Sequence, residues 1–208
     1  MNRQLSLFCS SSNSIEPHFF DAAIALGTAI GRARDTLIYG GGNVGLMGAV
    51  ATAVHMHGGR VVAVIPEALR HAGVCYEQAD ELIVTKDLRE RKGIMDQRAD
   101  AFIALPGGIG TLEEVIEIIT LKQLHYHTRP IVFLDIDHFY RPLLELFDHM
   151  VERHFLTSSA RELFFVTTAL DEVFAHIATY VPPCVEPKWI TPVAPWGKAP
   201  PEHDTPPD

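Results

Sequence analysis

The amino-acid sequence predicts an α/β protein built as a single doubly wound parallel sheet with helices on both faces. Short apolar segments alternate along the chain with longer amphipathic ones. Many of the short segments are continuously apolar, as in residues 60–65 (RVVAVI), and strands of this kind are buried on both faces of a parallel sheet. The chain has 208 residues, which suits about one domain with a full hydrophobic core.

Each element has its own signal, and the elements alternate strictly. Strands are predicted where apolar residues run together, at residues 5–9, 37–39, 60–65, 81–85, 101–105, 130–134 and 164–167. Helices are predicted at residues 17–34 and 139–155 from apolar residues at helical spacing, at 44–57 in a segment rich in small residues, from about 88 in a charged segment, and at 111–124 and 171–180. Strict alternation requires right-handed crossovers, and the ligands of such sheets bind beyond the carboxyl ends of the strands.

Charge and composition limit the classes of partner. The chain has 17 Lys and Arg residues against 26 Asp and Glu residues, a formal net charge of −9. A nucleic acid polymer is therefore not expected, because its binding depends on many basic side chains. No membrane partner is expected either, since no apolar run approaches roughly 18 residues, and the start lacks the apolar length of a secretory signal. Three widely spaced cysteines favour free thiols in the cytoplasm.

The last part of the chain differs from the rest. Nine of the 14 prolines lie in residues 182–208, where neither a helix nor a central strand is expected. We interpret residues 1–181 as one nucleotide-binding catalytic domain and residues 182–208 as a proline-rich tail. Two alternatives stay open for this tail: a disordered end, or a strap in which Trp189 or Trp196 docks on the body or on a second subunit.

A glycine-rich turn follows the second strand. Its sequence, GGGNVGLMG, covers residues 40–48 and leads into a helix. Glycines let a ligand approach the backbone, and a helix N-terminus attracts anions. The spacing differs from that of a dinucleotide fingerprint, and no acidic residue ends the next strand. A nucleotide or phosphate loop is the favoured interpretation, and a tight turn with close packing at Gly45 and Gly48 is the alternative.

A second glycine-rich turn, PGGIGTLEE, follows the strand at 101–105 and covers residues 106–114. Its bare backbone and the hydroxyl of Thr111 would hold a monophosphate with neutral groups. The lysine of a P-loop is missing, so nucleoside triphosphate hydrolysis is not expected. Glu114 and Glu117 share a helix face beside this turn and could act on a sugar or activate water. Arg91, in the cluster of residues 89–92, could pair with an anionic ligand or a carboxylate.

Together these segments resemble a known family. The stretches YGGGNVGLMGAV (39–50) and ERKGIMDQRADAFIALPGGIGTLEE (90–114) are similar to the LOG family of cytokinin riboside 5′-monophosphate phosphoribohydrolases, long labelled lysine decarboxylases. The motif P-G-G-x-G-T-x-x-E is matched at every position, from Pro106 to Glu114. Residues 8–12 (FCSSS) resemble the first turn of the family, with Ser10 in place of a glycine. The similarity runs from about residue 5 to residue 180.

The resemblance implies a Rossmann-like subunit in a homodimer that hydrolyses the N-glycosidic bond of N6-substituted adenine nucleotides, and of AMP itself. The products would be a free base and ribose 5-phosphate, with no cofactor and no metal. It implies catalytic roles for Arg91 and Glu114. Substrate contacts are expected, from the resemblance and from the glycine-rich turns, at Ser10, Gly41, Gly42, Lys92, Met95, Gly107, Gly108, Ile109, Gly110, Thr111, Leu112, Glu113, Glu117 and Thr120.

Several alternatives remain beside this assignment. A carrier or sensor that binds a nucleotide or the molybdenum cofactor without hydrolysis is the main rival, and the Arg91–Glu114 combination favours the enzyme. A true lysine decarboxylase would need pyridoxal phosphate on a lysine, and none of the five lysines has such a context. Leu121 stands where many relatives have Trp, which leaves the accepted base open. Histidines at 55, 57, 125 and 127 are expected in surface or capping roles, and Cys9 in the core.

Overall fold

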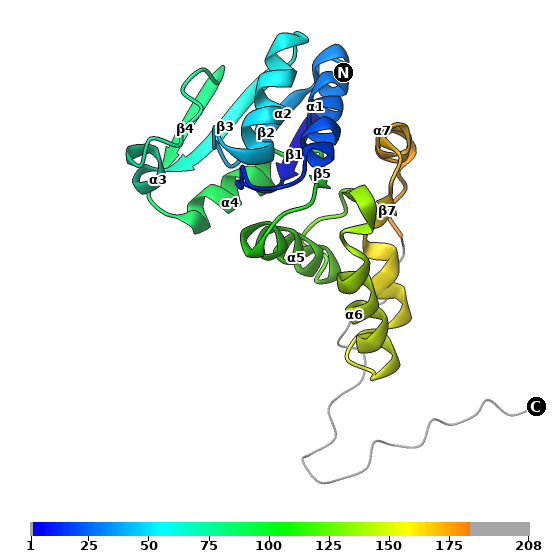
Figure 1. Ribbon diagram of the computed structural model, residues 1–208. Coiled ribbons are helices and arrows are strands. Elements are labelled where there is room, and N and C mark those ends of the chain that lie inside the picture. The colour runs from blue at the N-terminus through cyan, green and yellow to red at the C-terminus, as the bar shows by residue number, and fades with distance from the viewer. Residues whose placement is uncertain (1, 184–208) are drawn as a thin grey trace, which may run out of the picture.

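The computed structural model describes residues 2–183, and in them a seven-stranded sheet is wholly parallel, in the order β4-β3-β2-β1-β5-β6-β7 (Figure 1). The strands are β1 (Gln4–Phe8), β2 (Thr36–Tyr39), β3 (Arg60–Pro66), β4 (Glu81–Thr85), β5 (Ala101–Ala104), β6 (Ile131–Leu134) and β7 (Phe165–Thr167). This architecture confirms the predicted single, doubly wound, Rossmann-like sheet.

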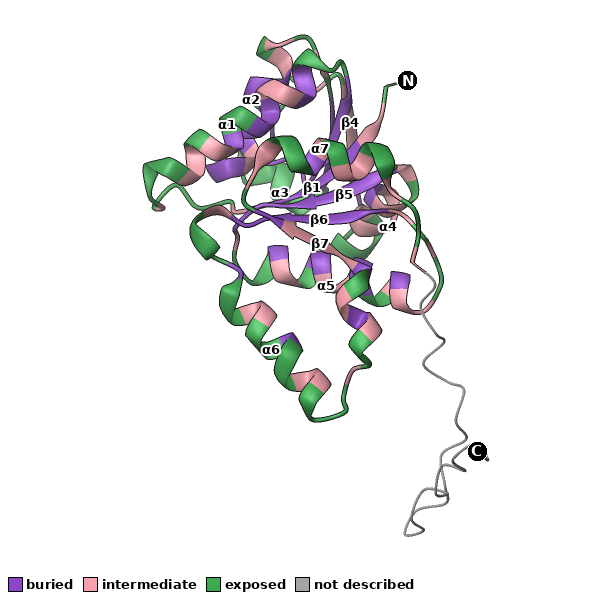
Figure 2. Ribbon diagram, turned by 90° about the vertical axis from the view of Figure 1, so that its right-hand side faces the viewer, coloured by how far each residue is buried: buried purple, intermediate pink, exposed green. Residues whose placement is uncertain are grey.

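Helices cover both faces of the sheet, as Figure 2 shows. The helices are α1 (Pro17–Arg32), α2 (Gly45–Met56), α3 (Glu67–His71), α4 (Leu88–Arg98), α5 (Ile109–Gln123), α6 (Arg141–Glu152) and α7 (Leu170–Thr179). Helices α1, α2 and α7 pack on one face, and α4 and α5 pack on the other. No helix in residues 2–183 is long and apolar enough to cross a membrane.

Two hydrophobic cores follow from the alternation of side chains along the strands. Leu5 and Leu7 of β1 point into the core under α1 and α2, whereas Phe8 points into the core under α4 and α5. The central strands are buried along their whole length, which explains why their sequences are continuously apolar rather than alternating.

The connections leave the sheet in opposite directions from two neighbouring strands, β1 and β5. The chain passes from β1 to β2 on one side, and from β5 to β6 on the other. Phe8 is in register with Ala104, so the loops that follow β1 and β5 lie side by side. Ser10 N donates to Pro106 O across them at 3.1 Å. A crevice at this topological switch point is where sheets of this kind bind ligands.

The predicted elements are confirmed in type, with differences at their ends. The helix predicted at 17–34 ends at Arg32, because Arg34 adopts a left-handed backbone with φ of 56°. The helix predicted from 111 begins at Ile109, two residues earlier, so Thr111 lies in its first turn. The helix predicted at 139–155 is shorter, and the 3-10 segment η1 (Ile136–His138) precedes it. Helix α3 and the 3-10 helix η2 (Ser158–Leu163) were not predicted.

Helix α6 extends away from the body of the molecule (Figure 1). It is strongly amphipathic, yet only Phe147 on it is buried. The predicted division at residue 181 stays a prediction, because most of the proline-rich tail, Trp189 and Trp196 included, lies outside the described residues.

Candidate active site

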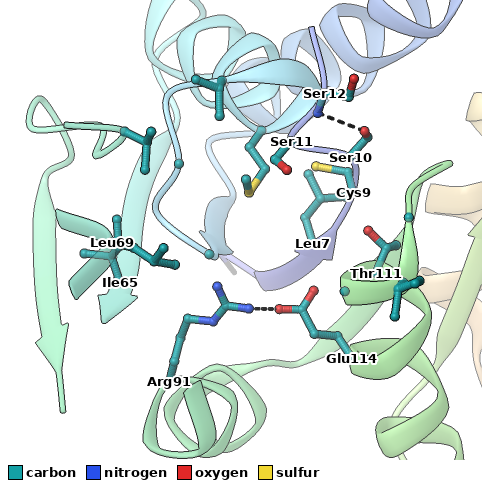
Figure 3. Close-up of a pocket in the computed structure, with 18 residues that line it drawn as sticks. Leu7, Cys9, Ser10, Ser11, Ser12, Ile65, Leu69, Arg91, Thr111 and Glu114 are labelled. Atoms are coloured by element: carbon teal, nitrogen blue, oxygen red, sulfur yellow. Dashed lines mark hydrogen bonds and ion pairs between the residues drawn. The ribbon is translucent and has the colours of Figure 1, made fainter. Parts of the chain in front are cut away.

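A cavity of about 500 Å³ opens at the carboxyl edge of the sheet, over β1 and β5. The residues that line it come from the end of β1 and the segment after it, from the turn after β2, from the end of β3 and the region after it, and from helices α4 and α5. They are Leu7, Cys9, Ser10, Ser11, Ser12, Gly40, Gly42, Val44, Met47, Ile65, Leu69, Val74, Arg91, Gly108, Ile109, Gly110, Thr111 and Glu114. Figure 3 shows the side chains of this cavity.

The N-terminus of α5 forms one end of the cavity. Gly108 caps the helix without a side-chain hydrogen bond, and the backbone N–H groups of Ile109, Gly110 and Thr111 have no acceptor among the described residues. A Cβ atom on Gly107 would lie 2.1 Å from Thr111 Oγ1 and 3.0 Å from Ser10 N, so only glycine fits there. Free N–H groups at the positive end of a helix dipole make an anion site without a formal charge.

At the first glycine-rich turn, two N–H groups at the start of α2 already have acceptors within the chain. At the N-terminus of α2, Gly45 N donates to Asn13 Oδ1 at 2.8 Å, and Leu46 N donates to Ser10 O at 3.0 Å. A Cβ on Gly45 would lie 2.5 Å from the Ser11 backbone. Close packing therefore accounts for Gly45. Gly40 and Gly42 line the cavity wall, and the nucleotide or phosphate loop expected over residues 40–48 stays a prediction.

Helix α4 brings a cation to the middle of the cavity. Its start is capped by side chains, because Asp87 Oδ1 accepts from Glu90 N at 2.9 Å and Glu90 Oε2 accepts from Lys86 N, just before the N-cap, at 2.8 Å. Met95 lies on the same helix face one turn after Arg91 and is only 1% exposed, in the core under the sheet. Burial of Met95 holds α4 against the sheet, with the guanidinium of Arg91 beneath Gly40.

Arg91 and Glu114 meet as a largely buried ion pair that joins α4 to α5 (Figure 3). The Arg91 side chain is 13% exposed and that of Glu114 is 10% exposed. Burial raises the pKa of Glu114 above its usual value, and the positive charge of Arg91 opposes this shift. Arg91 Nε is buried and has no hydrogen-bond partner within residues 2–183. The guanidinium therefore retains a donor beyond the one that Glu114 uses.

A second ion pair lies beside the first but outside the cavity. Lys92 Nζ contacts Glu113 and lies 2.8 Å from Glu117 Oε2. Although partial burial opposes it, hydrogen bonds to these carboxylates raise the pKa of Lys92. None of the three residues lines the cavity. In this structure they join α4 to α5, and the substrate contacts predicted for Lys92, Glu113 and Glu117 stay predictions.

Comparison with known proteins gives a matching family model and several similar proteins. A family model described as "Possible lysine decarboxylase" matches residues 47–177. A cytokinin riboside 5′-monophosphate phosphoribohydrolase of Arabidopsis thaliana is 41% identical over 86% of this chain and 83% of its own length. Another from the same plant is 39% identical, over 86% of this chain and 84% of its own. The chain belongs to this family, the LOG family. The predicted resemblance is thereby confirmed.

Solved structures with lower identity show the same fold. A molybdenum cofactor binding protein of Rippkaea orientalis superposes with a TM-score of 0.66 at 20% identity, covering 86% of this chain and 97% of that one. A molybdenum cofactor carrier protein of Chlamydomonas reinhardtii gives a TM-score of 0.66 at 21% identity, with the same coverage. At such low identity these likenesses concern the fold alone.

Half of the predicted LOG site residues come together in the cavity. Those that line it are Ser10, Gly42, Arg91, Gly108, Ile109, Gly110, Thr111 and Glu114. Gly107 lies directly beneath Thr111. The other predicted residues lie elsewhere: Gly41 packs against Ile65 with φ of 76°, Met95 and Leu112 contribute to the core, and Thr120 lines an apolar groove beside α6. Leu121, in place of the Trp of many relatives, also packs on the core and not in the cavity.

Sequence reasoning missed one wall of the cavity. Ile65, Leu69 and Val74 line it, from the end of β3, from α3 and from the segment that follows. Ile65 could have been found, because it ends a predicted strand at the carboxyl edge. Leu69 and Val74 have no pattern around them that predicts a site. Helix α3 is only five residues long, and none of its residues is buried.

His55, His57 and Cys9 make contacts within the fold. His55 bonds to Tyr76 and Asp80, whereas His57 Nδ1 contacts Ala53 O at 2.9 Å, so the two rings have separate partners. Within residues 2–183 no group of three His, Cys, Asp or Glu side chains is arranged to hold a metal ion. Burial raises the pKa of the Cys9 thiol far above its usual value, which disfavours the nucleophilic thiolate.

Proposed function

We propose that this chain hydrolyses the N-glycosidic bond of N6-substituted adenine nucleoside 5′-monophosphates, and of AMP, to release the base and ribose 5-phosphate. One observation carries the proposal: a neutral anion site and a buried Arg–Glu pair share a single cavity at the switch point of the sheet. Membership of the LOG family, whose relatives bear the name of this activity, supports the same reaction.

In this reaction the backbone N–H groups of Ile109, Gly110 and Thr111 bind the 5′-phosphate. The dipole of α5 attracts the phosphate locally, although the chain as a whole carries a net negative charge. Because Glu114 lies on the next turn of α5, the sugar of a nucleotide bound here extends toward its carboxylate. Binding energy from the phosphate thus positions the anomeric carbon, and a nucleoside without phosphate loses rate as well as affinity.

Glu114 and Arg91 act at the anomeric carbon. The Glu114 carboxylate stabilises the positive charge that develops on the sugar ring, and orients the attacking water. Arg91 fixes that carboxylate and partly offsets the rise in pKa that burial causes. The bond between the anomeric carbon and the base nitrogen breaks with its electron pair going to the base. The hydroxyl of water bonds to the carbon, and the remaining proton reaches the base by way of Glu114.

The test is base release from AMP and from an N6-alkylated AMP, followed by chromatography. Glu114→Gln keeps the size of the side chain but removes its charge, and we expect kcat to fall by at least about 100-fold. Glu145→Gln, at an exposed glutamate of α6, is the matched control and keeps full activity. Full activity in Glu114→Gln contradicts the proposed chemistry. Tight binding of intact nucleotide by the native chain without base release would instead favour the carrier or sensor.

We also propose that the chain is a cytoplasmic homodimer. The groove between α5, α6 and η2 supports a second copy as its occupant, because most of the residues that line it are apolar. Its walls include Ile116 and Ile119 of α5, together with Leu143, Leu146 and Met150 of α6. Leu146 is 47% exposed in the single chain. Free thiols at Cys9 and Cys75 suit a reducing compartment.

A further inference from the structure

The cavity has two chemically different ends. The polar side chains that line it lie after β1, in Ser10 to Ser12, or at the Arg91–Glu114 pair and the start of α5. The opposite wall is formed by glycine and apolar residues only: Gly40, Gly42, Val44, Met47, Ile65, Leu69 and Val74. Figure 3 shows Ile65 and Leu69 across the cavity from Thr111, with Arg91 and Glu114 between them.

This order along the cavity determines where the base lies. If the phosphate binds at the start of α5 and the anomeric carbon lies at Glu114, the base extends toward Ile65, Leu69 and Val74. That wall has no side chain that can donate or accept a hydrogen bond from a base. The wall therefore selects its ligand by apolar contact and shape.

The part of the wall around Val74 is held firmly. Val74 O accepts from Asn43 N at 2.7 Å, and Tyr76 N donates to Gly41 O at 2.9 Å, so the segment pairs with the first glycine turn. The Tyr76 hydroxyl also lies 2.9 Å from His55 Nδ1, and His55 Nε2 lies 2.8 Å from Asp80 Oδ2. These contacts fix the position of Val74 relative to the cavity.

Leu69 differs from Val74 because its surroundings leave it accessible. It lies on α3, whose residues are all exposed, and its own exposed fraction is 40%. A leucine at the cavity wall with that much free surface gains contact when an apolar group covers it. The unsubstituted base of AMP lacks such a group, and an alkyl substituent on the base supplies it.

We propose that Leu69 and Val74 are the specificity-determining residues of this site, and that they select nucleotides whose base carries an apolar substituent. This inference rests on the proposed function, because it requires the phosphate at α5 and the sugar at Glu114. The substituent lies against Leu69, with Val74 as the fixed surface beside it. No contact of these two residues with the reacting bond is required.

The experiment compares AMP with a series of N6-alkylated AMP analogues of increasing chain length. In the native chain, kcat/KM rises with alkyl length. Leu69→Asn and Val74→Thr keep side-chain size while making the wall polar, and each lowers the ratio of kcat/KM for the longest analogue over AMP by about tenfold. Ile24→Asn, at an exposed position of α1 outside this cavity, is the control and keeps the native ratio.

The ratio separates specificity from folding, because both substrates are cleaved by the same enzyme sample. A variant that is partly unfolded loses both activities together and keeps the native ratio. Base release by the native chain, with an unchanged ratio in both wall variants, overturns the inference and leaves the proposed function standing. Absence of base release from every nucleotide overturns the proposed function and the inference with it.

Discussion

The absence of a side chain at Gly40 gives Arg91 the space to reach Glu114. The guanidinium passes beneath Gly40, where a Cβ atom would lie 3.0 Å from Nη1 and 3.5 Å from Cζ. The backbone of Gly40 is not in the left-handed region, so an alanine could adopt its conformation. The constraint at this position is therefore the space that the arginine needs, and not the backbone.

Gly40→Ala is expected to displace Arg91 while leaving the fold intact. Because the crowded atoms belong to the end of a flexible side chain, the melting temperature changes little. A shift of the guanidinium weakens its hold on Glu114, and kcat falls by about tenfold or more. Gly93→Ala is the matched control on α4, since a Cβ there meets nothing within 4 Å, and an alanine in a helix adds up to about 1 kcal/mol of stability. Native kcat in Gly40→Ala would contradict the role given to Arg91.

At the scale of elements, the two ends of α5 have different surroundings. Its first turns supply the anion site and Glu114, and its last turns bury a charge that no part of the site uses. Lys122 is 5% exposed, donates to Leu163 O at 2.8 Å, and lies 4.7 Å from the centre of the Tyr180 ring. Burial lowers the pKa of Lys122 to about 8. No carboxylate pairs with it in the part of the chain that the structure describes.

Lys122→Met is expected to stabilise the protein at neutral pH. In the unfolded chain this amine keeps an ordinary pKa near 10.5, so the folded form, with its lower pKa, binds protons more weakly. The cost of the buried charge is fully present below pH 8 and is relieved as the pH rises toward 10.5. Removing the charge adds roughly 1–3 kcal/mol to the free energy of unfolding at pH 7, and less at pH 10.

Urea titration at the two pH values measures this difference. Lys86→Met, at an exposed lysine, is the control and changes the free energy of unfolding little at either pH. A loss of stability in Lys122→Met at pH 7 would mean that the hydrogen bond to Leu163 and the contact with Tyr180 outweigh the cost of burying the charge.

At the scale of the whole molecule, α6 and its groove predict how copies of the chain assemble. A helix that extends from the body with an exposed apolar face is stable when another surface covers that face (Figure 1). Leu146→Asp places a charge in the proposed interface and is expected to halve the mass measured by sedimentation at micromolar concentration. Ile24→Asp, equally exposed on α1, leaves the mass unchanged. A native chain that sediments as a monomer would contradict the proposed dimer.

Much of the fold and the centre of the site could be predicted from local sequence. Continuous apolar segments required a parallel sheet buried on both faces, and alternation with amphipathic helices required a doubly wound topology. The turn from Pro106 to Thr111 predicted free N–H groups at a helix start from residue types alone, because glycines before a helix leave its N–H groups accessible, and the structure has them. The resemblance of residues 39–50 and 90–114 identified Arg91 and Glu114 as the pair that the structure brings into contact.

Tertiary structure alone decided what each glycine turn and each charge does. The turns at 40–48 and 106–114 look alike as sequences, but Asn13 and Ser10 accept from the first two N–H groups of α2, whereas the first three of α5 have no acceptor among the described residues. Lys92 follows Arg91 directly, yet the helix turns it toward Glu113 and Glu117. Leu69 reaches the cavity from a short exposed helix without a periodic pattern, and Val74 reaches it from the segment after that helix. These outcomes depend on contacts between segments far apart in the chain, which local residue patterns do not encode.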